Sequence, residues 1–315
     1  MYKVQQATQH FSEAAEFSGR AELWLPNPEL SHCMRGIASR DTRWCTLLPE
    51  QMNNYFPASP MCSLLWYWQG DCAVAPVATD QPGQRQIVPK ICLVGPHSYA
   101  TVSWNSGPMY ALILMLMPDA VVAMTGLDPG AFLDKIIPAE QVLPEPWWNM
   151  AQQIYDCADE ELAVPLLEQF LTQQWQSKRP EQHPVARLYR DWSGNLALRA
   201  ANSGLGRSLR QIERRIKSWT GQPLRELRGF SRSEQAFFDG VVATQEGKVN
   251  WTDIADENGY SDQSHLIRQT RRITGFAPED LRQRILLDEG FWMYRLWGFS
   301  EGSVRQVKIN QPEGA

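Results

Sequence analysis

Histidine is scarce in this sequence, and the common motifs of enzyme active sites are missing. The 315 residues include five histidines, and no two of them form a His-X-His pair. A cupin-type metal site needs clustered histidine and carboxylate ligands, which this spacing does not supply. The sequence contains no G-X-S-X-G, P-loop or G-X-G-X-X-G motif. We therefore expect no catalytic residue, no metal ligand and no cofactor, and we do not expect an enzyme.

Long hydrophobic runs are also missing. The longest apolar stretch, from Met109 to Met117, ends at Pro118 and Asp119 and is too short to cross a bilayer. The first residues lack the apolar segment and the small-residue cleavage site of a signal peptide. A cytoplasmic location is the expectation.

The six cysteines all lie in the first half of the chain. Their spacings include no C-X-X-C and match no zinc module. In a reducing compartment, buried free thiols are the expected state. The six are Cys33, Cys45, Cys62, Cys72, Cys92 and Cys157.

Charge is distributed unevenly along the chain. Residues 1–177 carry 8 Lys+Arg and 18 Asp+Glu, a net charge of −10. Residues 178–290 carry 19 Lys+Arg and 15 Asp+Glu, a net charge of +4. Phosphates repel the first part and attract the second, so nucleic-acid binding is expected only of the second.

A capped basic helix is predicted near the C-terminus. Asp262 is a helix-capping residue type, Gly275 is typical of a helix end, and a short helical pattern ends upstream at Gly259. Leu266 and Ile273 have inward spacing. Two helices joined by a glycine-containing turn, the second with a basic outer face, are typical of a helix-turn-helix.

The same pattern occurs earlier in the chain. Ser208 is followed 13 residues later by Gly221, as Asp262 is by Gly275, and the two segments are 54 residues apart. Leu209, Ile212 and Ile216 have inward spacing in the earlier copy. The two segments therefore form an internal repeat, with a linking helix predicted over 231–245.

The segments SLRQIERRIKSWTGQP and IADENGYSDQSHLIRQTRRITGFAPEDLR resemble the tandem helix-turn-helix domain of AraC/XylS-family transcription regulators. The resemblance covers roughly Leu188 to Ile285. Thr270 stands where that family usually has an aromatic residue. NYFPASPMCSLLWYWQGD and GPHSYA resemble, more weakly, a β-rich sensor domain associated with that family. The resemblance implies a homeodomain-like DNA-binding region and a transcription regulator, an activator among the alternatives.

The outward side chains of the two predicted recognition helices are the candidate DNA contacts. Arginine can pair with guanine, glutamine with adenine, glutamate with cytosine, and isoleucine can contact a thymine methyl group. Arg215 and Lys217 are alternatively phosphate contacts. The DNA-binding candidates are Arg210, Glu213, Arg214, Lys217, Gln263, Ser264, Ile267, Arg268 and Arg271.

The first half reads as β-rich. Short runs such as CSLLWYWQGD, YATVSW and MYALILMLM are separated by Pro, Gly, Asn and Asp, which favours a barrel or sandwich, a cupin-like barrel included. MYALILMLM has no polar alternation, so it is a strand buried on both faces or a buried helix. Short helices are expected near 12–17 and 28–33, and longer ones over 146–178, which serve either core packing or dimer contact. Trp66, Trp68 and Trp104 are expected in the core.

The predicted fold class is α+β, with an N-terminal β-rich domain carrying helices and a C-terminal all-α double helix-turn-helix. The predicted domains are a sensor or dimerisation domain over 1–177, the DNA-binding domain over 178–290 and a tail over 291–315, whose aromatic stretch is expected to pack back as an extra helix. The partners expected are double-stranded DNA, a small-molecule effector bound in the first domain, RNA polymerase and a second copy of the chain. The alternatives are a ligand-independent factor whose first domain only oligomerises, and an alkyl-transfer DNA-repair enzyme, whose cysteine cluster the spacings do not reproduce.

Overall fold

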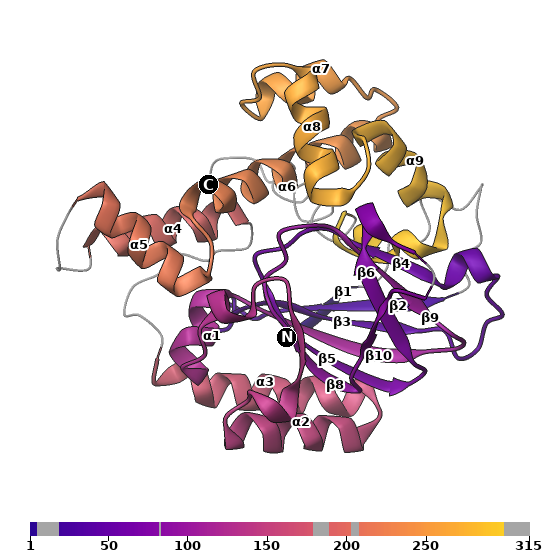
Figure 1. Ribbon diagram of the computed structural model, residues 1–315, viewed down its shortest axis with the longest axis vertical. Coiled ribbons are helices and arrows are strands. Elements are labelled where there is room, and N and C mark those ends of the chain that lie inside the picture. Colours follow the sequence, from indigo (N-terminus) through magenta and orange to yellow (C-terminus); the bar gives the residue numbers. More distant parts are fainter. Residues whose placement is uncertain (5–18, 82, 179–188, 203–207, 299–315) are drawn as a thin grey trace, which may run out of the picture.

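The computed structural model describes residues 1–315 apart from 5–18, 82, 179–188, 203–207 and 299–315. The expected helix over 12–17 therefore lies outside the described residues. Strands and a few helices make up the first half of the chain, and helices make up the second (Figure 1). The predicted α+β class, with a β-rich N-terminal part and an all-helical C-terminal part, is confirmed.

Two antiparallel sheets form a sandwich in the first half. The larger sheet has the strand order β1 (Tyr2–Val4), β2 (Arg20–Leu25), β3 (Met34–Asp41), β10 (Tyr110–Leu116), β5 (Cys62–Gln69), β8 (Ile91–Val94) and β11 (Ile136–Pro138). The smaller sheet has the order β4 (Asn53–Phe56), β9 (Thr101–Asn105), β6 (Cys72–Pro76) and β7 (Gln86–Val88). Because the smaller sheet has four strands and the larger has seven, it cannot cover all of the larger sheet's inner face.

The central strand β10 is the apolar run of the sequence. It pairs with β3 on one side and β5 on the other, and all seven of its residues are buried. An interior strand covered on both faces needs no polar alternation, which explains why its sequence has none. The alternative of a buried helix is excluded for this segment.

Helices cover the outer face of the larger sheet (Figure 1). They are α1 (Pro118–Thr125), α2 (Glu145–Cys157) and α3 (Glu160–Gln176). Trp66 Nε1 donates to the Ala151 carbonyl at 2.9 Å, and Trp68 Nε1 donates to the Ile154 carbonyl at 3.0 Å. Trp66 is fully buried, so the two strand tryptophans anchor α2 and belong to the core or its edge. The residues 28–33, expected to be helical, form turns.

The second half consists of α4 (Tyr189–Asn202), α5 (Leu209–Thr220), α6 (Leu224–Gln245), α7 (Trp251–Glu257), α8 (Gln263–Thr274) and α9 (Pro278–Leu287). We call α4 with α5 the first helix pair and α7 with α8 the second helix pair. The linking helix α6 begins at Leu224 rather than at Ser231, because Pro223, two residues after the glycine that ends α5, provides its extended N-cap. The helix α8 packs on the N-terminal half of α6, where Arg272 pairs with Glu226 at 2.8 Å and Ile273 shares a hydrophobic cluster with Phe230.

The short elements η2 (Pro49–Met52), η3 (Val77–Thr79), η4 (Pro129–Phe132), η5 (Ala139–Gln141) and η6 (Glu289–Phe291) complete the described fold. After η6 the chain is helical over 292–298. We call 289–298 the C-terminal segment. None of the helices in the described part of the chain combines the length and the hydropathy that a membrane span requires.

The C-terminal segment packs inside the sandwich. Trp292, Met293 and Leu296 share a hydrophobic cluster with β2, β3 and β10, on the inner face that the smaller sheet leaves uncovered. Trp292 Nε1 donates to Asn54 Oδ1 at 2.9 Å. Burial of these apolar side chains explains the aromatic composition of this stretch, which belongs to the predicted tail.

Candidate nucleic-acid interface and interdomain cavity

The N-termini of α5 and α8 are capped as the sequence predicts. Ser208 and Gln211 form a reciprocal capping box at the start of α5. Asp262 Oδ1 accepts from the His265 backbone N–H at 2.6 Å at the start of α8. These bonds satisfy backbone donors that a helix leaves unpaired at its first turn. Both helices therefore begin at a position fixed by their own sequence.

The C-termini of the two helices repeat each other atom for atom. Thr220 Oγ1 donates to the carbonyl four residues earlier at 2.8 Å, and Thr274 Oγ1 does the same at 2.8 Å. Each hydroxyl accepts from the backbone N–H two residues later, at 3.2 Å and 3.1 Å respectively. Gly221 and Gly275 then adopt φ of 74° and 86°, the left-handed conformation that favours glycine. The internal repeat is thus present in three dimensions.

The predicted DNA-contact side chains are accessible. Eight of the nine are exposed, and Ile267 is half-buried. The exposed ones are Arg210, Glu213, Arg214 and Lys217 on α5, and Gln263, Ser264, Arg268 and Arg271 on α8. Each helix therefore carries its basic stripe on the solvent side, and the two stripes are supplied by separate helix pairs.

Two side chains of α5 differ from the expectation. Leu209, expected to face inward, is 82% exposed. Its neighbours α1 and η4 contact the α5 helix, but the residues that become buried are Ile216 and Thr220, in its C-terminal half. Arg215, considered as a phosphate contact, donates from Nη1 to the Ala200 carbonyl at 2.7 Å and so joins α5 to α4.

One buried carboxylate docks the first helix pair on the first half of the chain. Asp119 on α1 is 7% exposed and accepts from Trp192 Nε1 at 2.9 Å and from Arg199 Nη1 at 2.6 Å. Next to it, Gly221 lies so close to Gly130 that a Cβ there would come within 2.8 Å of the Gly130 backbone. No signal in the sequence indicates these contacts, because the residues are 73 and more positions apart.

The second helix pair docks at a different place. The Ala58 backbone N–H donates to the Ile273 carbonyl at 2.7 Å, at the end of α8. Arg35 on β3 forms a buried ion pair with Glu234 on α6, and its guanidinium stacks on Trp297 at 4.8 Å. Arg40, also on β3, forms a fully buried ion pair with Glu289. The first half of the chain thus holds each helix pair by separate contacts.

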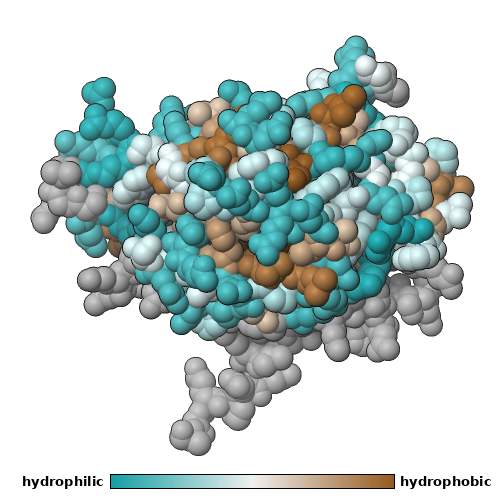
Figure 2. Space-filling model, turned by 90° about the horizontal axis from the view of Figure 1, so that it is seen from below, coloured by the Kyte–Doolittle hydropathy of each residue, from teal (hydrophilic) through white to brown (hydrophobic). Residues whose placement is uncertain are grey.

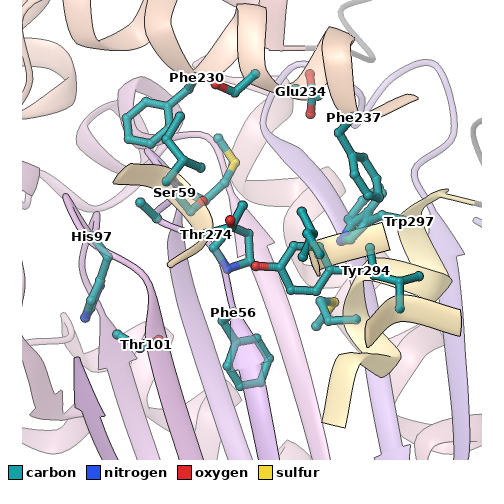
Figure 3. A pocket seen from close by; sticks show the side chains of 18 of the residues that line it. Phe56, Ser59, His97, Thr101, Phe230, Glu234, Phe237, Thr274, Tyr294 and Trp297 are labelled. Atoms are coloured by element: carbon teal, nitrogen blue, oxygen red, sulfur yellow. Dashed lines mark hydrogen bonds between the residues drawn. The ribbon is translucent and has the colours of Figure 1, made fainter. Parts of the chain in front are cut away.

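A cavity of about 300 Å³ lies between the sandwich and the second helix pair (Figure 3). Its walls come from three places: the inner faces of the sheets, the helices α6, α8 and α9, and the C-terminal segment. Its lining includes Phe56, Ile113, Phe230, Phe237 and Tyr294. A concave, mainly apolar site with a few polar groups is typical of a small-molecule pocket. The effector site was expected within 1–177, but the second half of the chain contributes much of this cavity's wall.

The charged groups of the cavity lining are compensated. Arg35 is paired with Glu234, and Arg282 donates from Nε to Glu279 Oε2 at 2.9 Å. Burial lowers the pKa of His97 below its ordinary value of 6.5, which favours the neutral imidazole, although Gly95 and Asp134 act in the opposite direction. His97, interpreted from sequence as a turn residue, is bridged to Ser59 through two backbone hydrogen bonds of 2.8 and 3.0 Å.

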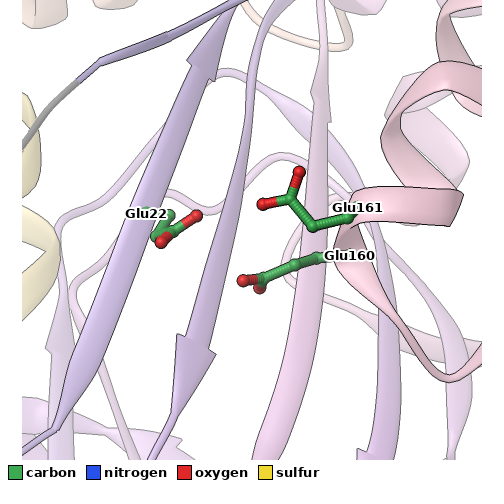
Figure 4. A group of neighbouring side chains, drawn as sticks. All are labelled: Glu22, Glu160 and Glu161. Carbon is green, nitrogen blue, oxygen red and sulfur yellow. The ribbon is translucent and has the colours of Figure 1, made fainter.

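Three carboxylates come together elsewhere, at the junction of β2 and α3 (Figure 4). They belong to Glu22, Glu160 and Glu161. Lys3 pairs with Glu22 and Glu161, and Arg20 pairs with Glu22 and Glu160. Since Lys3 and Arg20 already neutralise the carboxylates, we interpret the cluster as an ion-pair network that connects β1 and β2 to α3.

Burial disfavours the thiolate form of several cysteines. All six are free, and four of them are fully buried. Burial raises the pKa of the Cys62 thiol to about 12 and raises that of Cys33 and Cys92 further. A raised pKa disfavours the thiolate, the reactive form.

The face that carries α2 and α3 is seen in Figure 2. Apolar side chains lie there in separate patches among hydrophilic ones. Leu162 on α3 is 59% exposed, while Leu166 and Phe170 are partly buried against the core. Core packing and dimer contact were the two predicted roles of these helices. The inner side of the helices packs on the sheet, and dimer contact stays a prediction for the outer side.

Neither a protein-family model nor a curated protein matches the chain. Among solved structures, apo ToxT from Vibrio cholerae shares 11% identity over 85% of this chain and 97% of its own, with a TM-score of 0.36. ToxT with a bound unsaturated fatty acid shares 10% identity over 75% of this chain and 95% of its own, with a TM-score of 0.31. The AraC-like transcriptional activator CuxR shares 9% identity over 93% of this chain and 99% of its own, with a TM-score of 0.28. These TM-scores are low, and the likeness assigns no function to this chain.

Proposed function

We propose that the chain is a sequence-specific DNA-binding transcription regulator of AraC/XylS type, in which the two helix pairs contact one duplex. The observation that carries the proposal is the three-dimensional repeat: two helices with the same C-terminal caps, each with a solvent-facing basic stripe. A helix-turn-helix places such a helix in the major groove. We assign DNA binding to 178–290 and sensing or dimerisation to 1–177.

Electrostatics supports the same division. The first half carries a net charge of −10 and the second +4. Exposed arginines on α5 and α8 can release counterions from phosphates, whereas the acidic sandwich cannot. The proposal therefore confines the DNA to the side of the molecule formed by the helix pairs.

The test is selection of bound sites from random duplex DNA with the full chain. Arg214 and Arg268 occupy the same position in the two repeats, 54 residues apart. Replacing either by alanine should relax the preference at one base pair, at a cost of about 1–3 kcal/mol in binding free energy, and the two substitutions should affect different base pairs. Lys90→Ala, at an exposed position on the sandwich, is the matched control. It should change neither the base preference nor the binding free energy.

A uniform loss of affinity on all sequences would mean that these arginines only contact phosphates. Failure to select any sequence would contradict the proposal itself. The selected site also reports stoichiometry: an asymmetric site indicates one copy of the chain, and a repeated site indicates a dimer.

We further propose that a small molecule bound in the cavity between the two halves controls the regulator. A ligand that contacts β-sheet residues and α6, α8 and α9 at once favours one relative position of the two halves, which is a population shift. Whether the result is activation, through contact with RNA polymerase, or repression depends on the site in the promoter.

The second candidate is a ligand-independent factor whose first half only oligomerises. The outer face of α3, with Leu162 exposed, is the observation that favours it. A thermal-shift screen of the full chain against a broad metabolite set separates the two, because a ligand that binds only the folded form must raise the melting temperature.

A further inference from the structure

The buried hydroxyl of Tyr294 faces the cavity without a partner. Tyr294 is 5% exposed, and its Oη has no hydrogen-bond partner among the described residues. Figure 3 shows its ring directed into the cavity from the C-terminal segment. A buried donor without an acceptor costs free energy, so a hydroxyl of this kind at a cavity wall suggests that a bound molecule supplies the acceptor. Burial raises the pKa of Tyr294, so the hydroxyl keeps its proton and can donate it.

The rest of the lining selects against an anion. Arg35 is compensated by Glu234, and Arg282 is compensated by Glu279. A carboxylate in this cavity would have to compete for a guanidinium already bonded to a protein carboxylate, or remain uncompensated at low dielectric. The walls from Phe56, Ile113 and Phe237 offer only apolar surface.

The C-terminal segment is the part of the wall that a ligand would hold in place. It supplies Met293, Tyr294 and Trp297 to the cavity. It is itself seated by the buried Arg40–Glu289 ion pair and by a close approach at Gly290, where a Cβ would lie 2.3 Å from the Asn53 carbonyl oxygen. The segment follows directly on α9, so the position of the wall and the position of the second helix pair are linked through the chain.

We propose that the cavity binds a neutral, largely apolar molecule with one oxygen that accepts a hydrogen bond from Tyr294 Oη. The bound molecule stabilises the C-terminal segment in its position inside the sandwich. The ligand class is that of an apolar alcohol or ketone, whose oxygen accepts a hydrogen bond without carrying a charge. This inference deepens the effector control proposed above, but its test does not involve DNA, so loss of DNA binding and loss of ligand binding can be told apart.

The experiment compares decanol with decanoate, which share a chain length and differ in charge, on the full-length protein. Decanol should raise the melting temperature and slow hydrogen exchange within 289–298. Decanoate should have a smaller effect on both the melting temperature and the exchange. Equal or stronger binding of decanoate would overturn the ligand class, as would the absence of any decanol effect up to its solubility limit.

Tyr294→Phe tests the hydroxyl. Since it removes an unpaired buried donor, the ligand-free variant should melt at the same temperature as the parent or higher, while decanol binds roughly tenfold more weakly. A residue with only a packing role would not separate these two readouts. Unchanged decanol affinity in Tyr294→Phe would overturn the assigned hydrogen bond.

Gly290→Ala tests whether the cavity needs the C-terminal segment as part of its wall. Its methyl group meets the Asn53 backbone, so the C-terminal segment should be displaced and decanol binding lost. Gly194→Ala on α4 is the matched control, because a methyl group there meets nothing within 4 Å. Hydrogen exchange of β10 reports whether the sandwich of Gly290→Ala remains folded. Decanol binding that persists while exchange within 289–298 rises would overturn the role of the segment.

Discussion

The two helix pairs have the same local construction but are attached to the first half of the chain in different ways. α5 and α8 each span 12 residues, end with the same threonine hydrogen bonds and stop at a left-handed glycine. The first pair is held by a buried carboxylate on α1. The second is held by a backbone hydrogen bond at the end of α8, while a buried ion pair and the C-terminal segment hold α6 and α9 beside it around a cavity.

The difference separates what a repeat determines from what its surroundings determine. The caps and the inward side chains are local, so they recur with the repeat. The docking contacts come from elsewhere in the chain, so they differ between the copies. As a result a change at the cavity acts on the second pair directly and reaches the first through α6 or through the first half of the chain. If the two pairs bind one duplex, their relative position is the quantity that such a change alters.

The largest expected effect on stability is at Asp119, the carboxylate that docks the first helix pair on α1; we call its contacts the first dock, and the Ala58–Ile273 contact at the second helix pair the second dock. Asp119→Ala leaves the Trp192 indole N–H and the Arg199 guanidinium without their acceptor. We expect a loss of roughly 3 kcal/mol in unfolding free energy, at the low end for a broken buried pair because the Arg199 side chain is 31% exposed and can regain water. Urea unfolding measures the loss, and hydrogen exchange should accelerate in α4 and α5.

Asp119→Asn is the control for that dock, because it retains an acceptor for Trp192 and removes only the ion pair. Its loss should be smaller. If hydrogen exchange in α7 and α8 accelerated as much as in α4 and α5, the two docks would not be independent.

A smaller effect compares the two copies directly. Thr220→Val and Thr274→Val each remove a hydroxyl that accepts from a backbone N–H, at Gln222 and Phe276. We expect each to cost about 1–2 kcal/mol in unfolding free energy. Equal losses would confirm that the copies are energetically equivalent at this cap.

The control for the threonine pair is Thr244→Val on α6. Its hydroxyl makes a hydrogen bond to the Gly240 carbonyl at 2.7 Å and caps no helix end, and its side chain is half-buried. The loss in unfolding free energy for Thr244→Val should be smaller than for Thr220→Val and Thr274→Val. A large loss at Thr274 alone would show that the cavity side depends on this cap more than the first pair does.

The features that sequence reasoning predicted correctly are those that depend on near neighbours. The caps at Ser208 and Asp262, the stops at Gly221 and Gly275, and the buried strand at 110–116 all follow from local chemistry or from a continuous apolar run. The exposed basic stripes followed from helical periodicity.

The features that it missed depend on which surfaces meet. Leu209 has the spacing of an inward residue, but it is the first residue of α5 and is 82% exposed, whereas the buried residues of α5 lie in its C-terminal half. The role of the C-terminal segment depends on the smaller sheet having too few strands to cover the larger one. The cavity joins Ile113 to Tyr294, which no pattern along the chain connects.

The smallest expected effect is a pH dependence confined to the second dock. His97 is bridged to Ser59, next to the Ala58–Ile273 hydrogen bond, and burial lowers its pKa below 6.5. The unfolded chain then binds a proton more readily than the folded one, so the stability from neutral His97 is full above pH 6.5 and is lost as the pH falls through the folded pKa. Below pH 6.5 hydrogen exchange should accelerate at the C-terminal end of α8 and leave α5 unchanged. His97→Gln, which cannot titrate, should remove the dependence. A pH response of the same size in α4 and α5 would place its origin at other groups and would mean that the two docks do not act separately.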